Sequence, residues 1–219
     1  LTVSGITASN KVYDGLTTAT LNTGSASLVG LVGGDNVTLN TSAVTGTFGT
    51  KTIGTGKPVT IAGLTLDGDD AAYYTLTQPS ASANITARTL TVTAAGVNKV
   101  YDGTVTANVT LSDDRVAGDT LTTSYTVANF IDKHAGNGKT VNVYGITVTG
   151  LDAGNYNANT TASAIANITV RPVTVTAVTD NRTYDGSVNS TAQPVITLGS
   201  LAAGDTAVWV QTFDTKTVG

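Results

Sequence analysis

The sequence contains no cysteine and no methionine, and it has a single tryptophan and a single histidine. Without cysteine the chain can form neither a disulfide framework nor a thiolate metal site. Charged residues amount to only 12%, the formal net charge is −4, and the basic residues stand singly. We expect no nucleic-acid partner, because phosphate-binding surfaces need clustered basic residues. No apolar run is long enough for a membrane-spanning helix, so we also expect no direct membrane insertion.

Threonine, by contrast, makes up about a fifth of the chain. In TLTVTA (89–94) and VTVTAV (173–178) it alternates with apolar residues, which is the pattern of a strand with one buried face. Similar runs cover 59–66, 141–148 and 208–213, and they are separated by segments rich in the turn-forming residues Gly, Asp and Asn. These features predict an all-β fold built from small β-domains.

A Tyr-Asp-Gly triplet recurs at 13–15, 101–103 and 184–186, at intervals of 88 and 83 residues. Recurrence on this scale indicates a tandem array. We predict three domains: repeat 1 at 1–88, repeat 2 at 89–171 and a truncated repeat 3 at 172–219. Other landmarks keep the same order in each copy: a Gly-Asp pair beginning at Gly34, Gly118 and Gly204, and a phenylalanine followed three residues later by lysine, at Phe48, Phe130 and Phe213.

A unit of this length can bury its own core, so the repeats are expected to fold separately and to stand end to end. The segment NITARTLTVT (84–93) passes from one unit to the next without a flexible spacer, which predicts a stiff, extended array. Repeat 3 lacks the strands that would cover its own apolar face. The chain also begins with Leu1 rather than methionine. We therefore expect it to be a piece of a longer protein, cut arbitrarily within repeat 3. The alternative is that packing on the neighbouring repeat or on another chain orders this half-repeat.

The Tyr-Asp-Gly triplets are predicted to be structural turns. The tyrosine ring would pack into the core with its hydroxyl on a backbone partner, the aspartate would accept backbone N–H groups two residues on, and the glycine would take a positive φ. Catalysis would need a nucleophile, a base or a metal site at matching positions; none recurs, so we expect no enzyme activity. The predicted turn residues are Tyr13, Asp14, Gly15, Tyr101, Asp102, Gly103, Tyr184, Asp185 and Gly186.

The acidic loops contain the candidate metal ligands of the sequence. Asp67, Asp69 and Asp70 in one loop, and the aspartate pair 113–114 in another, carry oxygens suited to Ca²⁺ at a junction between domains. Repeat 2 matches only the last of the first three positions, as Asp152. A solvated loop without any cofactor is therefore the preferred interpretation.

A second tyrosine recurs at Tyr74 and Tyr156, after a loop rich in Gly and Asp. The preferred interpretation is an anchor at the edge of the core. The alternative is a platform on which a sugar ring stacks, but binding aromatics usually cluster and these two stand alone.

KVYDG, the Gly-Asp pair that follows it, GK-V leading into GLTL or GITV, and the closing NIT-R together resemble the YDG repeats of large bacterial proteins. These include filamentous-haemagglutinin-like adhesins and other giant surface or secreted exoproteins. The resemblance covers essentially the whole chain. It implies immunoglobulin-like β-sandwich modules, or alternatively β-grasp-like ones, that form stalks and supply no catalytic residues. It also implies an extracellular location, on the bacterial cell surface or secreted.

The expected function is that of a structural stalk or spacer, which projects the binding domain of an adhesin away from the cell. The alternative is a binding module, for carbohydrate or for homophilic contact between cells. Neighbouring repeats of the same chain are the expected partners, with host or cell-surface glycans or other adhesin copies as further ones. An exposed aromatic pocket repeated in both complete copies would favour the alternative.

Some surface adhesin domains carry an intramolecular amide cross-link between a lysine and an asparagine beside an acidic residue. A buried lysine with a lowered pKa would be the nucleophile. This cross-link is a hypothesis that intact mass tests, because each bond formed releases one ammonia. The candidate groups stand at matching positions of the two complete repeats: Lys57, Asn84 and Asp70 in the first, and Lys139, Asn167 and Asp152 in the second.

Overall fold

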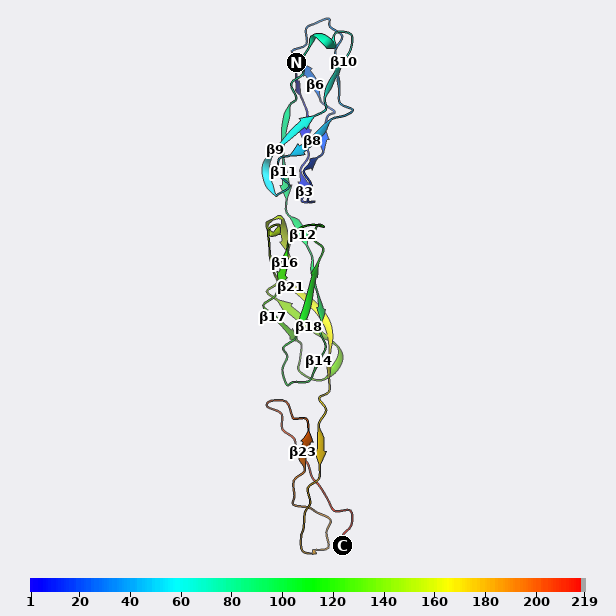
Figure 1. The fold of residues 1–219 in the computed structure, drawn as a ribbon, viewed down its shortest axis with the longest axis vertical. Coiled ribbons are helices and arrows are strands. Elements are labelled where there is room, and N and C mark those ends of the chain that lie inside the picture. The colour runs from blue at the N-terminus through cyan, green and yellow to red at the C-terminus, as the bar shows by residue number, and fades with distance from the viewer. Residues whose placement is uncertain (218–219) are drawn as a thin grey trace. The chain divides into compact units, whose positions relative to one another are not determined.

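The structure, a computed structural model, describes residues 1–217 and is built from β-strands (Figure 1). Within these residues the helical elements are two short 3-10 turns, η1 (Ala71–Tyr73) and η2 (Ala153–Asn155). The all-β prediction is confirmed. No helix in residues 1–217 has the length and apolar character needed to cross a membrane.

The strands of repeat 1 are short except for β9 and β11. In chain order they are β1 (Thr2–Ser4), β2 (Thr7–Ala8), β3 (Lys11–Val12), β4 (Thr18–Ala19), β5 (Leu21–Asn22), β6 (Ser27–Val29), β7 (Thr38–Asn40), β8 (Thr45–Phe48), β9 (Gly54–Ala62), β10 (Thr65–Asp67) and β11 (Ser80–Thr86). Five of them form one sheet in the order β3-β11-β9-β8-β4, and the remaining strands pair as the ribbons β1–β6, β7–β10 and β2–β5.

The five-stranded sheet is mixed and curled. Its edge strand β3 runs parallel to β11, and the other neighbours are antiparallel. On β9, Val59 and Ile61 are fully buried while Thr60 between them is exposed, as the alternation of a strand requires. The register between β11 and β9 shifts near Asn84, and such bulges bend a strand.

Repeat 2 repeats this plan with a four-stranded sheet, β14-β21-β18-β17, in which β14 runs parallel to β21. An isolated bridge between Thr106 and Asn129 takes the place of the β4–β8 pairing. Figure 1 shows β18 beside β21, its antiparallel partner. The strands are β12 (Arg88–Leu90), β13 (Val92–Gly96), β14 (Lys99–Val100), β15 (Val109–Asp113), β16 (Thr122–Ser124), β17 (Val127–Phe130), β18 (Gly136–Tyr144), β19 (Thr147–Thr149), β20 (Tyr156–Ala158) and β21 (Thr161–Thr169).

Each complete repeat contains a set of buried apolar side chains. Within the described chain, no strand of residues 1–86 pairs with a strand of residues 88–217. Full burial of a side chain such as Phe48 or Ile168 contributes about 1.5–3 kcal/mol. The buried set of repeat 1 is Tyr13, Ala19, Val37, Phe48, Val59, Ile61, Leu64, Ala83 and Ile85, and that of repeat 2 is Leu90, Val92, Ala107, Val109, Leu121, Ala128, Phe130, Val141, Val143, Ile146, Tyr156, Ala164, Ala166 and Ile168.

Repeat 3 has little regular structure. Its strands are β22 (Thr174–Thr176) and β23 (Val195–Leu198), and its last two predicted residues, 218 and 219, lie outside the described residues. The strand predicted at 208–213 is wrong: the segment forms only an isolated bridge, between Thr212 and Asn189. Among the apolar residues of 172–217 only Ala202 is buried. The physical reason is that residues 172–217 contain no counterparts of β9 and β11, which cover this face in repeat 1.

The chain divides into two compact units. Unit 1 contains 1–92, 113–124 and 147–160; unit 2 contains 93–112, 125–146 and the described residues from 161 on. The division runs through repeat 2, so each unit contains one junction between successive repeats. The three domains predicted from the repeat boundaries stay a prediction about independent folding.

Candidate functional site at the junctions between repeats

Each Tyr-Asp-Gly turn closes around a basic side chain two residues before the tyrosine. In repeat 1 the Nζ of Lys11 donates to Asp14 Oδ1 at 2.8 Å and to the carbonyl oxygens of Leu16 and Thr18 at 2.7 and 3.0 Å. Asp14 Oδ1 also accepts the backbone N–H of Leu16. Gly15 has a φ of 78°, which favours glycine because a Cβ makes this conformation costly.

The other two turns have the same arrangement. The Nζ of Lys99 donates to Asp102 Oδ1 and to two carbonyl oxygens further along its turn, each at 2.8 Å. In repeat 3 the guanidinium of Arg182 donates to Asp185 Oδ2 at 2.7 Å and to the carbonyl oxygen of Ser187. The hydrogen bond from Lys99 lowers the pKa of Asp102 to about 2, so this ion pair is intact at neutral pH.

A phenylalanine ring lies over the basic group of every turn. At these separations the cation is attracted to the face of the ring. The sequence shows that these phenylalanines recur, but it does not show what they contact. The cation lies 5.6 Å from the ring centroid for Lys11 and Phe48, 5.5 Å for Lys99 and Phe130, and 4.9 Å for Arg182 and Phe213.

The hydroxyl of Tyr13 bonds to an aspartate of the following repeat. It donates to Oδ2 and Oδ1 of Asp119 at 2.8 and 3.0 Å. Tyr156, also from repeat 2, donates to Asp119 Oδ2 at 2.6 Å, and the two tyrosine rings meet edge to face with centroids 5.4 Å apart. Tyr13 is 0% exposed and Asp119 is 8% exposed. The predicted backbone partner for the Tyr13 hydroxyl is therefore wrong, because its partner is a buried carboxylate.

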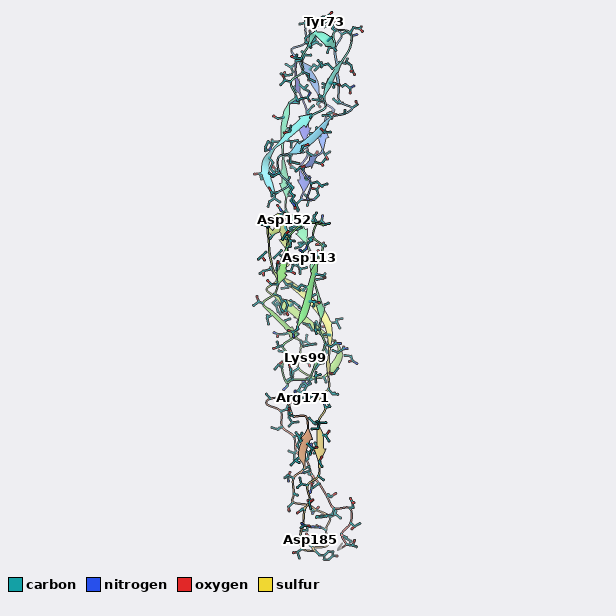
Figure 2. All side chains as sticks on the ribbon, viewed as in Figure 1. Tyr73, Lys99, Asp113, Asp152, Arg171 and Asp185 are labelled. Atoms are coloured by element: carbon teal, nitrogen blue, oxygen red, sulfur yellow. The ribbon has the colours of Figure 1, made fainter. Side chains whose placement is uncertain are left out.

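Lys51 of repeat 1 balances the charge of this buried carboxylate. Its Nζ lies 2.9 Å from Asp119 Oδ1 and 3.1 Å from Asp152 Oδ1, and Asp152 is labelled in Figure 2. Burial raises the pKa of Asp119, but hydrogen bonds from the two tyrosines and Lys51 outweigh it and hold this pKa below its usual value. Burial and the bond to Asp119 raise the pKa of Tyr156 to about 12. At neutral pH the cluster thus holds an ionised aspartate and un-ionised tyrosines.

Two further contacts tighten the same junction. The backbone N–H of Ile53 donates to Asn155 Oδ1 at 3.1 Å, and the backbone N–H of Val116 donates to the Tyr156 hydroxyl at 2.9 Å. A Cβ added to Gly15 would lie only 2.9 Å from Val116 Cγ1, so the glycine also permits a close approach. We call this junction joint 1, and its residues are Tyr13, Gly15, Lys51, Ile53, Val116, Asp119, Asp152, Asn155 and Tyr156; all of them belong to unit 1.

Repeats 2 and 3 meet in a second junction, joint 2, inside unit 2. The hydroxyl of Tyr101 donates to Asp205 Oδ1 at 3.1 Å, and Lys133 Nζ lies 3.6 Å from the same oxygen. The Nε of Arg171 donates to the carbonyl oxygen of Ser200 at 2.6 Å. Repeat 3 has no counterpart of Tyr156, and a hollow of about 320 Å³ lies beside Tyr101. Joint 2 therefore uses the counterparts of the tyrosine, lysine and aspartate of joint 1, and these make fewer contacts.

The second tyrosines bond to the aspartates of their own repeats. Tyr74 donates its hydroxyl to Asp35 Oδ2, as Tyr156 does to Asp119. The ring of Tyr156 is covered by Tyr13, which leaves no open face on which a sugar could stack. Tyr73, which precedes Tyr74 and is labelled in Figure 2, has an exposed ring.

The cross-link candidates of repeat 1 have other partners. The Nζ of Lys57 donates to the carbonyl oxygen of Thr52 at 2.6 Å. Asn84 Oδ1 and Asp70 Oδ2 each accept a backbone N–H, at 2.7 and 2.8 Å. The structure therefore does not bring the amine, the amide and the carboxylate together.

The candidates of repeat 2 are likewise apart. Lys139 forms an ion pair with Asp132, Asn167 Oδ1 accepts the backbone N–H of Gly138 at 2.8 Å, and Asp152 belongs to joint 1. The amide cross-link stays a hypothesis for both repeats, and intact mass remains its test.

The acidic loops bond within the protein. Asp67 and Asp69 accept side-chain N–H groups of asparagines, Asp113 pairs with Arg115, and Asp114 accepts a backbone N–H. In residues 1–217 no three Asp, Glu, His or Cys side chains converge as ligands for a metal ion.

The sequence-based reasoning missed the roles of Lys51 and Asp119. Its landmarks nevertheless contained the signal, because the Gly-Asp pair and the lysine three residues after each phenylalanine recur in step with the Tyr-Asp-Gly turn. These landmarks mark the two sides of a junction rather than a single turn.

The fold and its junctions define an all-β tandem-repeat protein whose successive repeats are joined by a cluster of tyrosine, lysine and aspartate. The model of the YDG domain family matches the chain twice, over residues 1–83 and 86–164. These matches cover most of the chain and coincide with repeats 1 and 2, so the chain belongs to the YDG domain family. No curated protein and no solved structure matches the chain.

Proposed function

We propose that the chain is a series of structural spacer repeats in a bacterial surface or secreted adhesin, where it holds a binding domain away from the cell. The proposal includes immunoglobulin-like or β-grasp-like modules arranged end to end, and an extracellular location. The observation that carries it is joint 1, in which a buried carboxylate is held by side chains of two successive repeats.

A spacer needs junctions that resist bending, and joint 1 has the chemistry for this. Moving the repeats apart would break the hydrogen bond from Tyr13 to Asp119 and the ion pair of Asp119 with Lys51. A hydrogen bond to a charged group contributes about 1.5–3 kcal/mol. Only Ala87 separates β11 from β12, so the connecting backbone has little freedom of its own.

The side chains with strongly shifted pKa values also favour a structural role. Shifted pKa values at Tyr13, Lys51, Asp119 and Tyr156 would mark an active site if these groups faced a cleft. Here they bond to one another inside a junction. Glycan binding has less support, because Tyr74 and Tyr156 bond to aspartates.

Distances between spin labels test the stiffness of joint 1. The chain has no cysteine, so Thr60→Cys and Thr149→Cys, both at exposed positions of unit 1, provide unique labelling sites. We expect a single narrow distance distribution, which Asp119→Ala broadens. A broad distribution in the chain with an intact joint would contradict the spacer proposal.

The location is tested separately. Antibodies against the chain should label intact cells of the source bacterium or its culture medium. Labelling confined to lysed cells would overturn the extracellular location.

A further inference from the structure

The sheet of repeat 2 carries apolar side chains on the face that points away from its core. We propose that this face binds the same face of a second copy of the chain, so that two copies associate sheet against sheet. The outer face, as we call it, lies on β17, β18 and β21, which are labelled in Figure 1. Its residues are Val127, Asn129, Ile131, Asn142, Tyr144 and Ile165.

Strand pairing brings the side chains of the outer face together. Val127 of β17 lies opposite Tyr144 of β18, and Asn129 lies opposite Asn142. The residues that alternate with them on the two strands are buried, so these four side chains share the outward side of the sheet.

Two isoleucines extend the same face. Ile165 of β21 lies opposite Thr140 of β18, and the backbone N–H of Ile131 donates to the carbonyl oxygen of Thr140 at 3.2 Å. Ile131 is 62% exposed and Ile165 is 69% exposed. Neighbouring exposed apolar side chains of this kind mark interaction surfaces.

Repeat 1 shows that the fold does not require these apolar side chains. It forms the corresponding sheet with the same pairing of its strands, and the matching positions are small or polar and exposed. The apolar residues of repeat 2 therefore serve something other than the fold. The residues of repeat 1 that match Val127, Ile131, Tyr144 and Ile165 are Thr45, Gly49, Ala62 and Ser82.

The outer face lies outside the junctions between repeats. Ile131 is its residue nearest in sequence to a junction lysine, Lys133. In joint 1, where both repeats are complete, the counterpart of Ile131 is Gly49, which is exposed although Lys51 reaches repeat 2. The exposure of this position therefore does not depend on the neighbouring repeat.

A second copy of the same face fits its chemistry. In residues 127–132, 136–144 and 161–169 the charged side chains are Asp132 and Lys139, which pair with each other at 2.5 Å. An uncharged face does not repel its own copy and offers no complement to a charged partner. The amides of Asn129 and Asn142 each have donors and an acceptor, so they can bond to the same amides across a two-fold axis.

The contact between two outer faces is expected to be weak. It covers three strands, which is less than the roughly 800 Å² per partner of a standard interface. Facing sheets stand about 10 Å apart, so a short bis-maleimide reagent can link a cysteine on one face to the same cysteine on the other. Such trapping detects a weak contact better than measurement at equilibrium.

The experiment introduces Asn142→Cys into the cysteine-free chain, at the centre of the outer face. The matched control is Thr60→Cys, the corresponding position on β9 of repeat 1. We expect bis-maleimide to link two copies about tenfold faster through position 142 than through position 60. Accessibility alone would favour the control, because Thr60 is exposed and Asn142 is half-buried. Equal rates, or a faster control, would overturn the proposal.

Adding Tyr144→Ala and Ile165→Ser to the Asn142→Cys chain gives the outer face the residues of repeat 1. Its cross-linking should then slow to the rate of the control, while thermal unfolding stays unchanged. Ile165→Thr, which keeps a β-branched residue on the strand, is a milder variant and should lower the rate in the same direction. A rate that neither change lowers would overturn the proposal. The inference goes beyond the spacer function, which the spin labels in joint 1 test separately.

Discussion

The hydroxyl of Tyr13 donates a 2.8 Å hydrogen bond to Oδ2 of Asp119, which lies 106 positions further along the chain. The neighbours of Tyr13 in the motif have local tasks: Lys11 and Asp14 close the turn, and Gly15 adopts its positive φ. Among the side chains of the motif, the tyrosine makes the hydrogen bond to the next repeat, and Gly15 permits the close approach of Val116. The motif therefore combines a self-contained turn with one side of an interaction between repeats.

Replacing Tyr13 with phenylalanine removes this bond while keeping the ring. A hydrogen bond to a charged acceptor contributes about 1.5–3 kcal/mol, so Tyr13→Phe should weaken joint 1 by that amount. Faster hydrogen exchange at the backbone amides of Ile53 and Val116, which both bond across or beside the joint, measures the effect. Tyr184→Phe is the matched control and should change stability by less than about 0.5 kcal/mol, because Tyr184 is exposed. Equal effects of both substitutions would refute the assignment.

Joint 1 should lose stability in acid. The folded-state pKa of Asp119 lies below its unfolded value of about 3.9, so its contribution is complete above that value and is lost as the pH falls through the folded pKa. Urea unfolding between pH 7 and pH 2 measures the loss. Other aspartates titrate in the same range, so the difference between the unmodified chain and Asp119→Asn isolates this carboxylate. Parallel curves for the two proteins would contradict the prediction.

At high pH the stability of joint 1 should fall as the pH rises, which is the opposite of its dependence in acid. The pKa of Tyr156 is raised from 10.0 to about 12, so its contribution is complete below pH 10 and is lost as the pH rises towards 12. Tyr156→Phe should remove this alkaline loss, which ultraviolet absorbance of tyrosinate can follow. Ionisation of all tyrosines at their usual pKa would count against a buried hydrogen-bonded hydroxyl.

Gly15→Ala should destabilise joint 1 in two ways. The positive φ costs an alanine about 1–2 kcal/mol, and the new methyl group would lie 2.9 Å from Val116 Cγ1. Adding Val116→Ala should restore part of the loss, because it relieves the contact but not the φ. Gly186→Ala, with a φ of 75° and no atom near the added methyl, should show the cost of φ alone. Thermal unfolding compares the three variants, and absence of rescue would exclude the close approach.

Lys99→Met should destabilise repeat 2 by about 2 kcal/mol. The substitution leaves Asp102 and two carbonyl oxygens without their shared donor, and unsatisfied groups of this kind cost about 1–3 kcal/mol. Lys99→Arg is the conservative control, because Arg182 performs the same task in repeat 3. Denaturant unfolding should show a clearly smaller loss for the arginine variant. Equal losses would contradict the assignment, because they would show that retaining a positive charge at position 99 does not preserve the turn.

Intact mass should equal the sequence mass, with no loss of ammonia. Lys57 bonds to the carbonyl of Thr52, and Asn84 accepts a backbone N–H, so the amine is not positioned to attack the amide. Loss of one ammonia that disappears in Lys57→Arg would establish the cross-link instead.

Sequence reasoning succeeded where the controlling interactions are short-range. Alternation of threonine with apolar residues reflects the two faces of a strand, and the roles of Asp14 and Gly15 depend on atoms two or three residues away. The repeat intervals located the same turn three times.

Sequence reasoning failed where the hydrogen-bond partner of a residue lies in another repeat, or where a segment has no neighbouring strand to pair with. Periodicity cannot distinguish a tyrosine that faces its own core from one that faces the next repeat, so the link from Tyr13 to Asp119 was not foreseen. Alternation at 208–213 shows that the segment suits a strand, but a strand also needs neighbours to pair with. Spacing showed only that Lys57 and Asn84 recur at matching positions. It revealed neither that they lie on adjacent strands nor that the lysine bonds to Thr52.

The parallel pairing of β3 with β11, and of β14 with β21, determines how a complete repeat responds to mechanical load. A pull that reaches these strands from the two ends of the repeat draws them in opposite directions along their length. Their backbone hydrogen bonds are then sheared together instead of being unzipped one after another. The bond from the Tyr13 N–H to the Thr86 carbonyl extends this ladder to the residue that anchors Asp119. Tension applied through the following repeat would therefore load this pairing in shear.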